Sequence, residues 1–323
     1  MDLPCTWDAP RPYVHPLTSP AGAVLSVEAP GDHPWHHALW FTIKFVNGEN
    51  FWEEYGEFGT LRTTQVDETP VADNSVTATI EWVAPDGESI RLHETRSIRT
   101  EPIDADSYLI DWSESLTVPV ATELDRTPFT TWGGYGGLTL RGAPTWTDTV
   151  IRLADGTDRD RCLGDPSPWL SIEGTATEWT DKPNVRADKP SRSEARAEAS
   201  SEAVSPPRDA STEMANERAD GQEAVSPPQH ASTEMANVRA GRPAGAIVFD
   251  HPDNLRSPTP WYASTRADTY GDGWANFVNA AFLWNEALSL AADATLDLAY
   301  RVIVHDGHWE SDRIRAEYDR WIR

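Results

Sequence analysis

The sequence predicts an all-β protein, a large antiparallel β-sandwich that ends in a short helix. Three observations favour this class. Short segments of alternating polar and apolar residues recur along most of the 323-residue chain, turn dipeptides separate them, and only one segment has helical spacing. Many short antiparallel strands with few helices form a sandwich or a barrel. We expect the sandwich, as a single domain over residues 1–323.

The alternating segments give the expected strands in order. The segment SVTATIEWVAPDGESIRLHETRSIRT alternates around Asp86-Gly87, a dipeptide typical of hairpin turns. The expected strands lie within residues 58–118, 137–153, 245–250, 279–284 and 294–307. The expected helix covers residues 309–322, where acidic residues open the segment and Ile314, Tyr318 and Ile322 recur at spacings of four.

Residues 184–243 interrupt this pattern. The segment EAVSPPRDASTEMANERA (residues 202–219) recurs as EAVSPPQHASTEMANVRA (residues 223–240), a tandem duplication with a period of 21 residues. Ala, Ser, Glu and Pro dominate it, so it cannot bury enough apolar surface to offset the entropy of ordering. We expect a disordered low-complexity insertion in a surface loop, which does not split the domain.

The charge composition indicates the solvent in which the protein works. The formal net charge is −25, and lysine occurs only at Lys44, Lys182 and Lys189, the other basic residues being arginine. Molar salt screens the self-repulsion of such a surface, so we expect a halophilic, archaeal source. Binding of nucleic acid is not expected, because it needs basic stripes that are missing here.

The stability of the fold should therefore depend on salt. Below about 0.5 M salt the screening length grows and self-repulsion strengthens. We expect the melting temperature to rise markedly between low and molar KCl in a calorimetric series. A flat profile would refute the halophilic interpretation.

Location and cysteine content set further limits. No apolar run approaches the roughly 20 residues that span a bilayer, and residues 1–13 show no secretory signal, so we expect a cytoplasmic protein without membrane contact. The two cysteines, Cys5 and Cys162, make neither a disulfide framework nor a thiolate metal site.

Histidines gather in the segment DHPWHHALWF, which starts at residue 32. His33, His36 and His37 lie next to Asp32, and Glu53 and Glu54 follow a short distance along the chain. Clustered imidazoles beside carboxylates suit general acid–base chemistry, although a metal site and a plain polar loop remain alternatives. Neighbouring residues of an extended chain point in opposite directions, so His36 and His37 cannot easily ligate one ion. A carboxylate beside the indole of Trp52 can have a raised pKa.

Two further segments carry candidate binding groups. In TWGGYGGLTLR (residues 131–141) four glycines around Tyr135 permit close approach of a ligand, or simply form a tight bend. The segment FDHPDNLRSPTPWY (residues 249–262) combines aromatic rings with amide and carboxylate groups. Such a combination is typical of sugar sites, though a structural loop is an alternative.

Several motifs together resemble a known family. RPYVHPLTSPAG, DHPWHHALWF followed by VNGENFW, GGYGGLTLR, FDHPDNLRSPTPWY and YRVIVHDG are similar to the soluble proteins labelled "methane oxygenase PmoA family". The resemblance covers nearly the whole chain apart from the duplicated insertion. It implies a β-sandwich domain of unknown function that accompanies carbohydrate catabolism. The label conflicts with the sequence, because the methane monooxygenase subunit of that name is an integral membrane protein. Relatives commonly read DHPHHRGLWF, so a histidine, an arginine and a glycine of that pattern are replaced here.

Residues and resemblance together predict a carbohydrate-active protein with a mutarotase-like sandwich. We expect a hydrolase, lyase or isomerase that acts on a sugar or oxidised sugar, without cofactor or metal. His33 or His37 would move a proton with Glu54 as partner. The expected substrate-binding residues are His15, Tyr135, Arg141, His251, Asn254, Trp261 and Tyr262. The rival from another class is a non-catalytic sugar-binding or scaffold protein, and a metal-dependent oxygenase ranks last.

Overall fold

The computed structural model describes residues 3–68, 74–127, 135–177, 241–271 and 273–323. They belong to one compact unit, which residues 1–187 and 240–323 form. The duplicated segment and the disorder expected for it lie outside the described residues. Residues 242 and 243, which the sequence assigned to the insertion, already belong to a strand.

Antiparallel strands form three sheets, in agreement with the predicted all-β class. The seven-stranded sheet has the order β1 (Cys5–Thr6), β2 (Tyr13–Val14), β3 (Leu39–Ile43), β11 (Gly136–Arg141), β18 (Phe277–Ala280), β17 (Pro260–Ser264) and β14 (Arg161–Pro166). The nine-stranded sheet has the order β13 (Asp158–Arg159), β12 (Trp146–Leu153), β15 (Trp169–Ala176), β16 (Arg242–Asp250), β20 (Thr295–Asp306), β9 (Ser107–Thr117), β8 (Ile90–Asp104), β7 (Ser75–Val83) and β6 (Thr60–Glu68). The four-stranded sheet has the order β19 (Leu288–Leu290), β10 (Thr122–Asp125), β4 (Phe45–Val46) and β5 (Glu49–Asn50).

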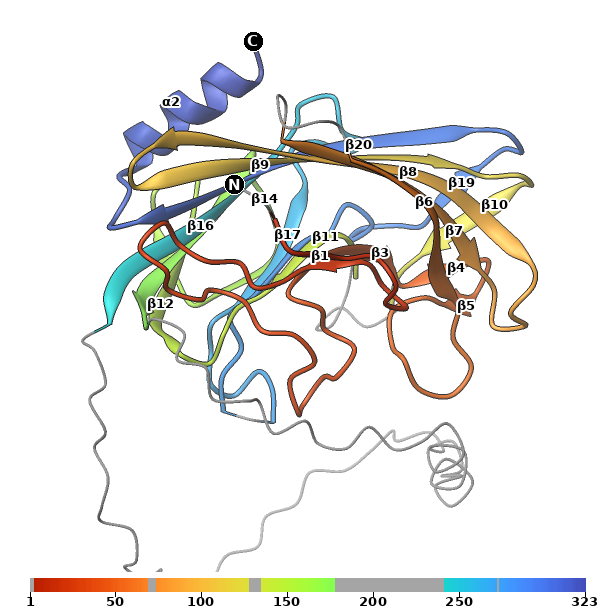
Figure 1. The fold of residues 1–323 in the computed structure, drawn as a ribbon, viewed down its shortest axis with the longest axis horizontal. Helices are drawn as coiled ribbons and strands as arrows, with labels where there is room; N and C mark the ends of the chain where they lie inside the picture. Colours follow the sequence, from red (N-terminus) through yellow and green to blue (C-terminus); the bar gives the residue numbers. More distant parts are fainter. Residues whose placement is uncertain (1–2, 69–73, 128–134, 178–240, 272) are drawn as a thin grey trace, which may run out of the picture. The chain divides into compact units, whose positions relative to one another are not determined.

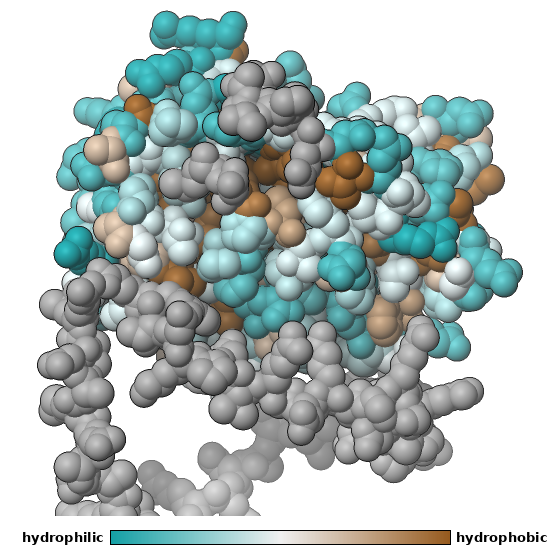
Figure 2. Space-filling model, viewed as in Figure 1, coloured by the Kyte–Doolittle hydropathy of each residue, from teal (hydrophilic) through white to brown (hydrophobic). Residues whose placement is uncertain are grey.

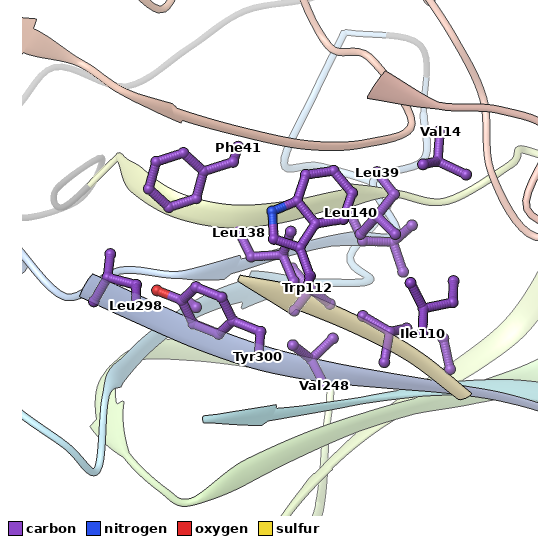
Figure 3. Packing of buried hydrophobic residues seen from close by; sticks show 14 of the residues in the cluster. Val14, Leu39, Phe41, Ile110, Trp112, Leu138, Leu140, Val248, Leu298 and Tyr300 are labelled. Carbon is purple, nitrogen blue, oxygen red and sulfur yellow. The ribbon is translucent and has the colours of Figure 1, made fainter. Parts of the chain in front are cut away.

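The two larger sheets pack face to face and enclose the main core (Figure 1). Alternate residues of β3 and β11, such as Leu39 and Leu138, point inward because side chains alternate between the faces of a strand. They meet inward residues of β9 and β20, such as Trp112 and Tyr300 (Figure 3). This packing confirms the predicted sandwich.

The opposite face of the seven-stranded sheet carries polar and aromatic side chains. Cross-strand pairing places Trp40 opposite Thr139, Thr139 opposite Asn279, and Asn279 opposite Tyr262. A second row runs from Arg141 to Phe277. These residues belong to β3, β11, β18 and β17, so the register alone brings distant parts of the sequence together on this outer face.

Helix α2 (Ser311–Trp321) covers the outer face of the nine-stranded sheet. Its Ile314 and Tyr318 pack against Trp169, Phe249 and other outward residues. Asp312 lies in the first turn and Arg320 in the last, which complements the helix dipole. The prediction that Ile322 belongs to the apolar side of the helix is wrong, because Ile322 forms the C-cap and is exposed.

The long alternating segments form strands as predicted, whereas the strand predicted for residues 279–284 is shorter than expected. β6 to β9 occupy the region of residues 58–118, and a turn at Asp86-Gly87 joins β7 to β8. The expected strand at residues 279–284 contributes only its first two residues to β18. After Ala280 the chain turns, and the N–H of Trp284 donates to the carbonyl of Ala281.

A buried charged network lies inside the main core. The Arg96 guanidinium on β8 contacts the carboxylates of Glu94 at 2.8 Å and Glu114 at 2.9 Å, and all three side chains are fully buried. The indole N–H groups of Trp82 and Trp112 donate to Glu94 and Glu114, each at 2.6 Å. Burial, opposed by Arg96 and reinforced by Glu94, raises the pKa of Glu114 well above its ordinary value.

The surface seen in Figure 2 is mainly hydrophilic, with smaller hydrophobic patches between polar groups. The exposed large hydrophobic residues of the described ranges are Tyr55, Val66, Val120, Leu163 and Ile322. In the part of the chain that the structure describes, no helix combines the length and hydrophobicity that crossing a membrane requires.

Candidate functional site

The three clustered histidines lie on a loop beside the outer face of the seven-stranded sheet. Two backbone contacts close the base of this loop. The N–H of Ala29 donates to the carbonyl of His36 at 2.9 Å, and Glu28 pairs with His37 as an isolated bridge. Ala38, directly before β3, has a φ of 61°, a left-handed conformation that favours glycine. Such strain persists where the surroundings fix the chain, and it often marks functional segments.

His37 is held between two carboxylates. Its Nε2 lies 2.6 Å from Glu54 Oε1 and its Nδ1 lies 3.6 Å from Glu28 Oε1, while the ring of Tyr13 stacks on the imidazole at 5.2 Å. Burial lowers the pKa of His37, but contacts with Glu28 and Glu54 outweigh it, so the pKa is raised above 6.5. The two carboxylates therefore stabilise the charged form of His37, although its side chain is only 2% exposed.

A pH series should detect this charge. Because the folded-state pKa of His37 is raised, its contribution to stability is fully present below pH 6.5 and is lost as the pH rises through the folded value. We expect the free energy of unfolding of the wild type to exceed that of His37→Gln most strongly at low pH. Urea unfolding of both proteins across pH 5 to 9 measures this difference. A difference that does not vary with pH would contradict the prediction.

His33 is the accessible member of the cluster. Its side chain is 25% exposed, and its Nδ1 lies 3.3 Å from Asp32 Oδ2. The same carboxylate oxygen accepts a hydrogen bond from Arg141 Nη2 at 2.8 Å. Arg141 thus fixes Asp32, and Asp32 orients the imidazole of His33. A carboxylate behind an imidazole stabilises the imidazolium that forms on proton uptake.

The ring of His36 stacks on that of His33 at 4.7 Å and lies in an aromatic environment. Its ring contacts those of Trp40 at 5.4 Å and Phe277 at 5.2 Å, and its Nδ1 lies 3.4 Å from Arg141 Nη1. Burial, followed by the charge of Arg141, lowers the pKa of His36 well below 6.5. The imidazole is therefore neutral and structural at neutral pH. The rings of His36 and His37 both approach that of Trp40, but the polar partners differ: His36 lies near Arg141, whereas His37 lies between Glu28 and Glu54.

An aromatic cluster continues from His36 across the outer face of the sheet. Its buried members are Trp40, Trp52, Tyr135, Tyr262, Tyr270, Ala275, Phe277 and Ala281, with Tyr13, Trp35 and Trp284 at the margin. Tyr135 stacks on Trp52 at 4.7 Å, and the ring of Tyr270 lies 4.4 Å from that of His33. Arg141 lies over the rings of Tyr270 and Trp274, at 4.3 and 4.2 Å. The cluster joins the loop histidines to the sheet.

Two more buried cations accompany the carboxylates of residues 53 and 54. Lys44 forms an ion pair with Glu53. Arg11 is fully buried near Glu53 and Glu54, and burial lowers its pKa to about 10 despite these negative charges. Glu53 therefore contacts the buried Lys44, and Glu54 contacts the buried His37.

The structure gathers some of the expected site residues. His37 contacts Glu54, and Tyr135 and Tyr262 share the aromatic cluster, with ring centroids 5.6 Å apart. His15 Nδ1 lies 2.9 Å from Ser26 Oγ. Burial lowers the pKa of His15 and the charge of Glu28 opposes this. His15 therefore borders the same carboxylate as His37.

The other expected binding residues lie outside this group and serve contacts of their own. Asn254 uses its side-chain amide to bind Asp250 Oδ1 at 2.8 Å and the backbone of Ala299. Trp261 is fully buried on the core side of β17, and its indole donates to Ser167. His251 contacts the ring of Trp321 near helix α2. No contact of the described residues joins these three side chains to the histidine loop.

Several important side chains were not singled out from sequence. Glu28, Tyr270, Trp274, Phe277 and Asn279 belong to loops or short strands whose proximity depends on the fold. Lys44 had a signal, since it is one of only three lysines. Within the described ranges no group of three or more His, Cys, Asp or Glu side chains is arranged to hold a metal ion.

Comparison with known proteins assigns a family without assigning an activity. A model described as a family of unknown function (DUF6807) matches residues 4–219 and 195–319. No curated protein and no solved structure matches the chain. Because the match covers nearly the whole sequence, this chain belongs to DUF6807, a family of unknown function.

Proposed function

We propose that the protein is a carbohydrate-active enzyme, a hydrolase, lyase or isomerase that moves a proton on a sugar or oxidised sugar. The observation that carries the proposal is the pairing of two histidines with carboxylates beside one aromatic cluster. His37 contacts Glu54 at 2.6 Å, and His33 is backed by Asp32. Aromatic faces bind the apolar C–H faces of sugar rings, and histidine–carboxylate pairs transfer protons.

The two pairs have different roles because their exposure differs. His33 is partly exposed next to Tyr270, so its imidazole can touch a ligand directly. Both nitrogen atoms of His37 face carboxylates, and its ring is buried, so it acts through Glu54, which is 15% exposed. In this arrangement Glu54 exchanges a proton with substrate, and His37 sets the charge of Glu54.

A substrate screen tests the proposal. Purified protein in molar KCl is incubated with unmodified, oxidised and carboxylated glycosides, and products are followed by chromatography and NMR. We expect turnover of at least one glycoside by the wild type and its loss in His33→Asn. If no glycoside of any class is converted, the enzymatic proposal fails.

A non-catalytic sugar-binding protein is the second candidate, and one observation favours it. The aromatic cluster is extensive, whereas the proton-transfer groups are few and largely buried. Calorimetric binding without turnover, unchanged by His33→Asn, would establish this alternative.

A further inference from the structure

One arginine on the outer face of the seven-stranded sheet has no polar partner among the described residues. Arg161 on the edge strand β14 is partly exposed, and its buried Nε donates no hydrogen bond. Of the arginines in the described ranges that are not exposed, only Arg11 and Arg161 form no ion pair, and Arg11 donates to backbone carbonyls. A guanidinium is always charged, and withdrawing a charge from water without a partner is costly. In a chain of net charge −25, an unpaired arginine of this kind indicates an anionic ligand.

The acidic side chains around Arg161 are engaged elsewhere. Arg159, two residues away, pairs with Asp155 at 2.7 Å. Asp268 pairs with Arg266 at 2.8 Å. The pKa of Asp268 is lowered first by its hydrogen bond to Arg266, and the charge of Arg161 contributes least. The fold therefore pairs the neighbouring arginines and leaves Arg161 for a group that the described residues do not supply.

Strand register places Arg161 on the face that carries the candidate site. Arg161 pairs with Ser264 and Leu163 pairs with Tyr262, whereas Cys162 between them faces the main core. Side chains alternate along a strand, so Arg161 and Tyr262 both leave the outer face. Burial raises the pKa of the Tyr262 phenol, and the charge of Arg161 is among the effects that oppose this rise. The guanidinium therefore lies close to the phenol.

Tyr262 links Arg161 to the accessible histidine. The hydroxyl groups of Tyr262 and Tyr270 interact, and the ring of Tyr270 lies 4.4 Å from that of His33. The charge of Arg141 also acts on Tyr262, but Arg141 is already paired with an aspartate at 2.8 Å. Of these two guanidinium groups, only that of Arg161 is available to an anion that approaches the His33 side of the aromatic cluster.

Apolar surface lies beside this guanidinium. The side chain of Leu163 is 39% exposed, and the partly exposed Trp284 stacks on Tyr262 with ring centroids 6.1 Å apart. Sugar rings pack their C–H faces on such surface, whereas a free inorganic anion gains nothing from it. One guanidinium neutralises one negative charge, and its planar fork matches a carboxylate. These surroundings suit a sugar with one carboxylate better than a phosphate dianion.

We propose that Arg161 binds the carboxylate of an oxidised sugar, beside Tyr262 and on the His33 side of the aromatic cluster. The proposal rests on the carbohydrate-directed function above and narrows its substrate class to sugars that carry a carboxylate, in preference to neutral sugars.

Matched probes test the charge preference. Each p-nitrophenyl hexoside is compared with its 6-phosphate and with its uronoside, which carries a carboxylate in place of the C6 hydroxymethyl group. Affinities are measured by isothermal titration calorimetry on the full chain, at the lowest KCl concentration that keeps it folded, because salt screens partly exposed charges. We expect at least one uronoside to bind about ten- to a hundredfold more tightly than its hexoside, the value of a charged hydrogen-bonded contact. Hexosides that all bind as tightly as their uronosides, 6-phosphates that all bind more tightly, or binding of no probe would overturn the proposal.

Two variants test the residue. Arg161→Gln removes the charge, so uronoside affinity should fall about ten- to a hundredfold while hexoside affinity stays close to that of the wild type. Arg161→Lys keeps the charge without the planar fork and should recover part of the loss. Melting temperatures verify that both variants are folded. Wild-type uronoside affinity in Arg161→Gln, or an equal loss of hexoside affinity, would contradict the subsite.

Arg159→Gln is the matched control. It removes the same charge from the same segment, but the Arg159 guanidinium already has Asp155 as its partner. The uronoside preference should therefore persist, and a loss as large as in Arg161→Gln would assign the preference to overall charge and refute the subsite. Failure of the subsite and failure of the enzymatic function are distinguishable. Conversion of glycosides without any uronoside preference refutes only the subsite, and uronoside binding that depends on Arg161 without conversion refutes only the enzyme.

Discussion

Replacing Arg96 with methionine should lower the free energy of unfolding by about 3–5 kcal/mol, the usual cost of removing one partner from a buried ion pair. The change leaves the carboxyl groups of Glu94 and Glu114 fully buried without the guanidinium that both contact. It also removes the hydrogen bond from Arg96 Nη1 to the carbonyl of Pro12. Urea unfolding in molar KCl measures the loss. A variant as stable as the wild type would show that the network contributes little.

Glu114→Gln is the control for this prediction. Burial raises the folded-state pKa of Glu114, so the native protein holds a proton that the unfolded chain releases near pH 4.5. Stability should therefore fall as the pH rises from that value through the folded pKa. Glutamine imitates the protonated carboxyl group, so the variant should remain folded and lose this part of the pH dependence. A pH profile identical to that of the wild type would contradict the assignment.

Replacing Glu54 with glutamine should reduce turnover of the substrate by about 10²- to 10⁴-fold, the usual contribution of a positioned acid–base group. The amide keeps the shape of the side chain but cannot exchange a proton with His37 or with substrate. His37→Gln should show a loss of similar direction, because it removes the group that sets the charge of Glu54. Steady-state kinetics on the glycoside found by the screen measures both.

Glu49→Gln provides the matched control for this activity loss. The side chain of Glu49 pairs with that of Arg91 at 2.7 Å, and both side chains are partly exposed. Its turnover should equal that of the wild type. Wild-type turnover in Glu54→Gln, with a normal melting temperature, would remove Glu54 from the mechanism. A general loss of folding in Glu54→Gln would instead identify a structural carboxylate.

The sequence predicted the parts of the fold whose signal is local. The long strands β8, β9 and β20 alternate over many residues, so the period of two identified them. The two-residue strands β1 and β2 carry too few residues for any period to emerge. β1 pairs with β2, and β2 pairs with β3, through contacts that only the tertiary structure supplies. The pairing of β2 with β3 places Tyr13 close to His37.

The candidate site was predictable in its centre and not at its margins. The adjacent residues of the histidine segment and Glu54 are close enough in sequence for composition to indicate them. Arg141 and Tyr270 meet Asp32 and His33 only through sheet register and the loop that follows β17. The aromatic and amide residues of the segment 249–262 predicted one binding site, but they lie in two different environments. Tyr262 and Trp261 leave opposite faces of one strand, so only Tyr262 reaches the aromatic cluster.

The hairpin of β15 and β16 has an evolutionary consequence. Ala176 pairs directly with Arg242, so the sheet itself fixes the two ends of the intervening 65 residues side by side. The lengthening of a closed loop costs only a logarithmic term in entropy, and neither strand changes its register when chain is added between them. A gene can thus gain or lose a 21-residue copy there while Ala176 and Arg242 keep their pairing. The same position would suit new termini in a circular permutant or the insertion of a reporter domain.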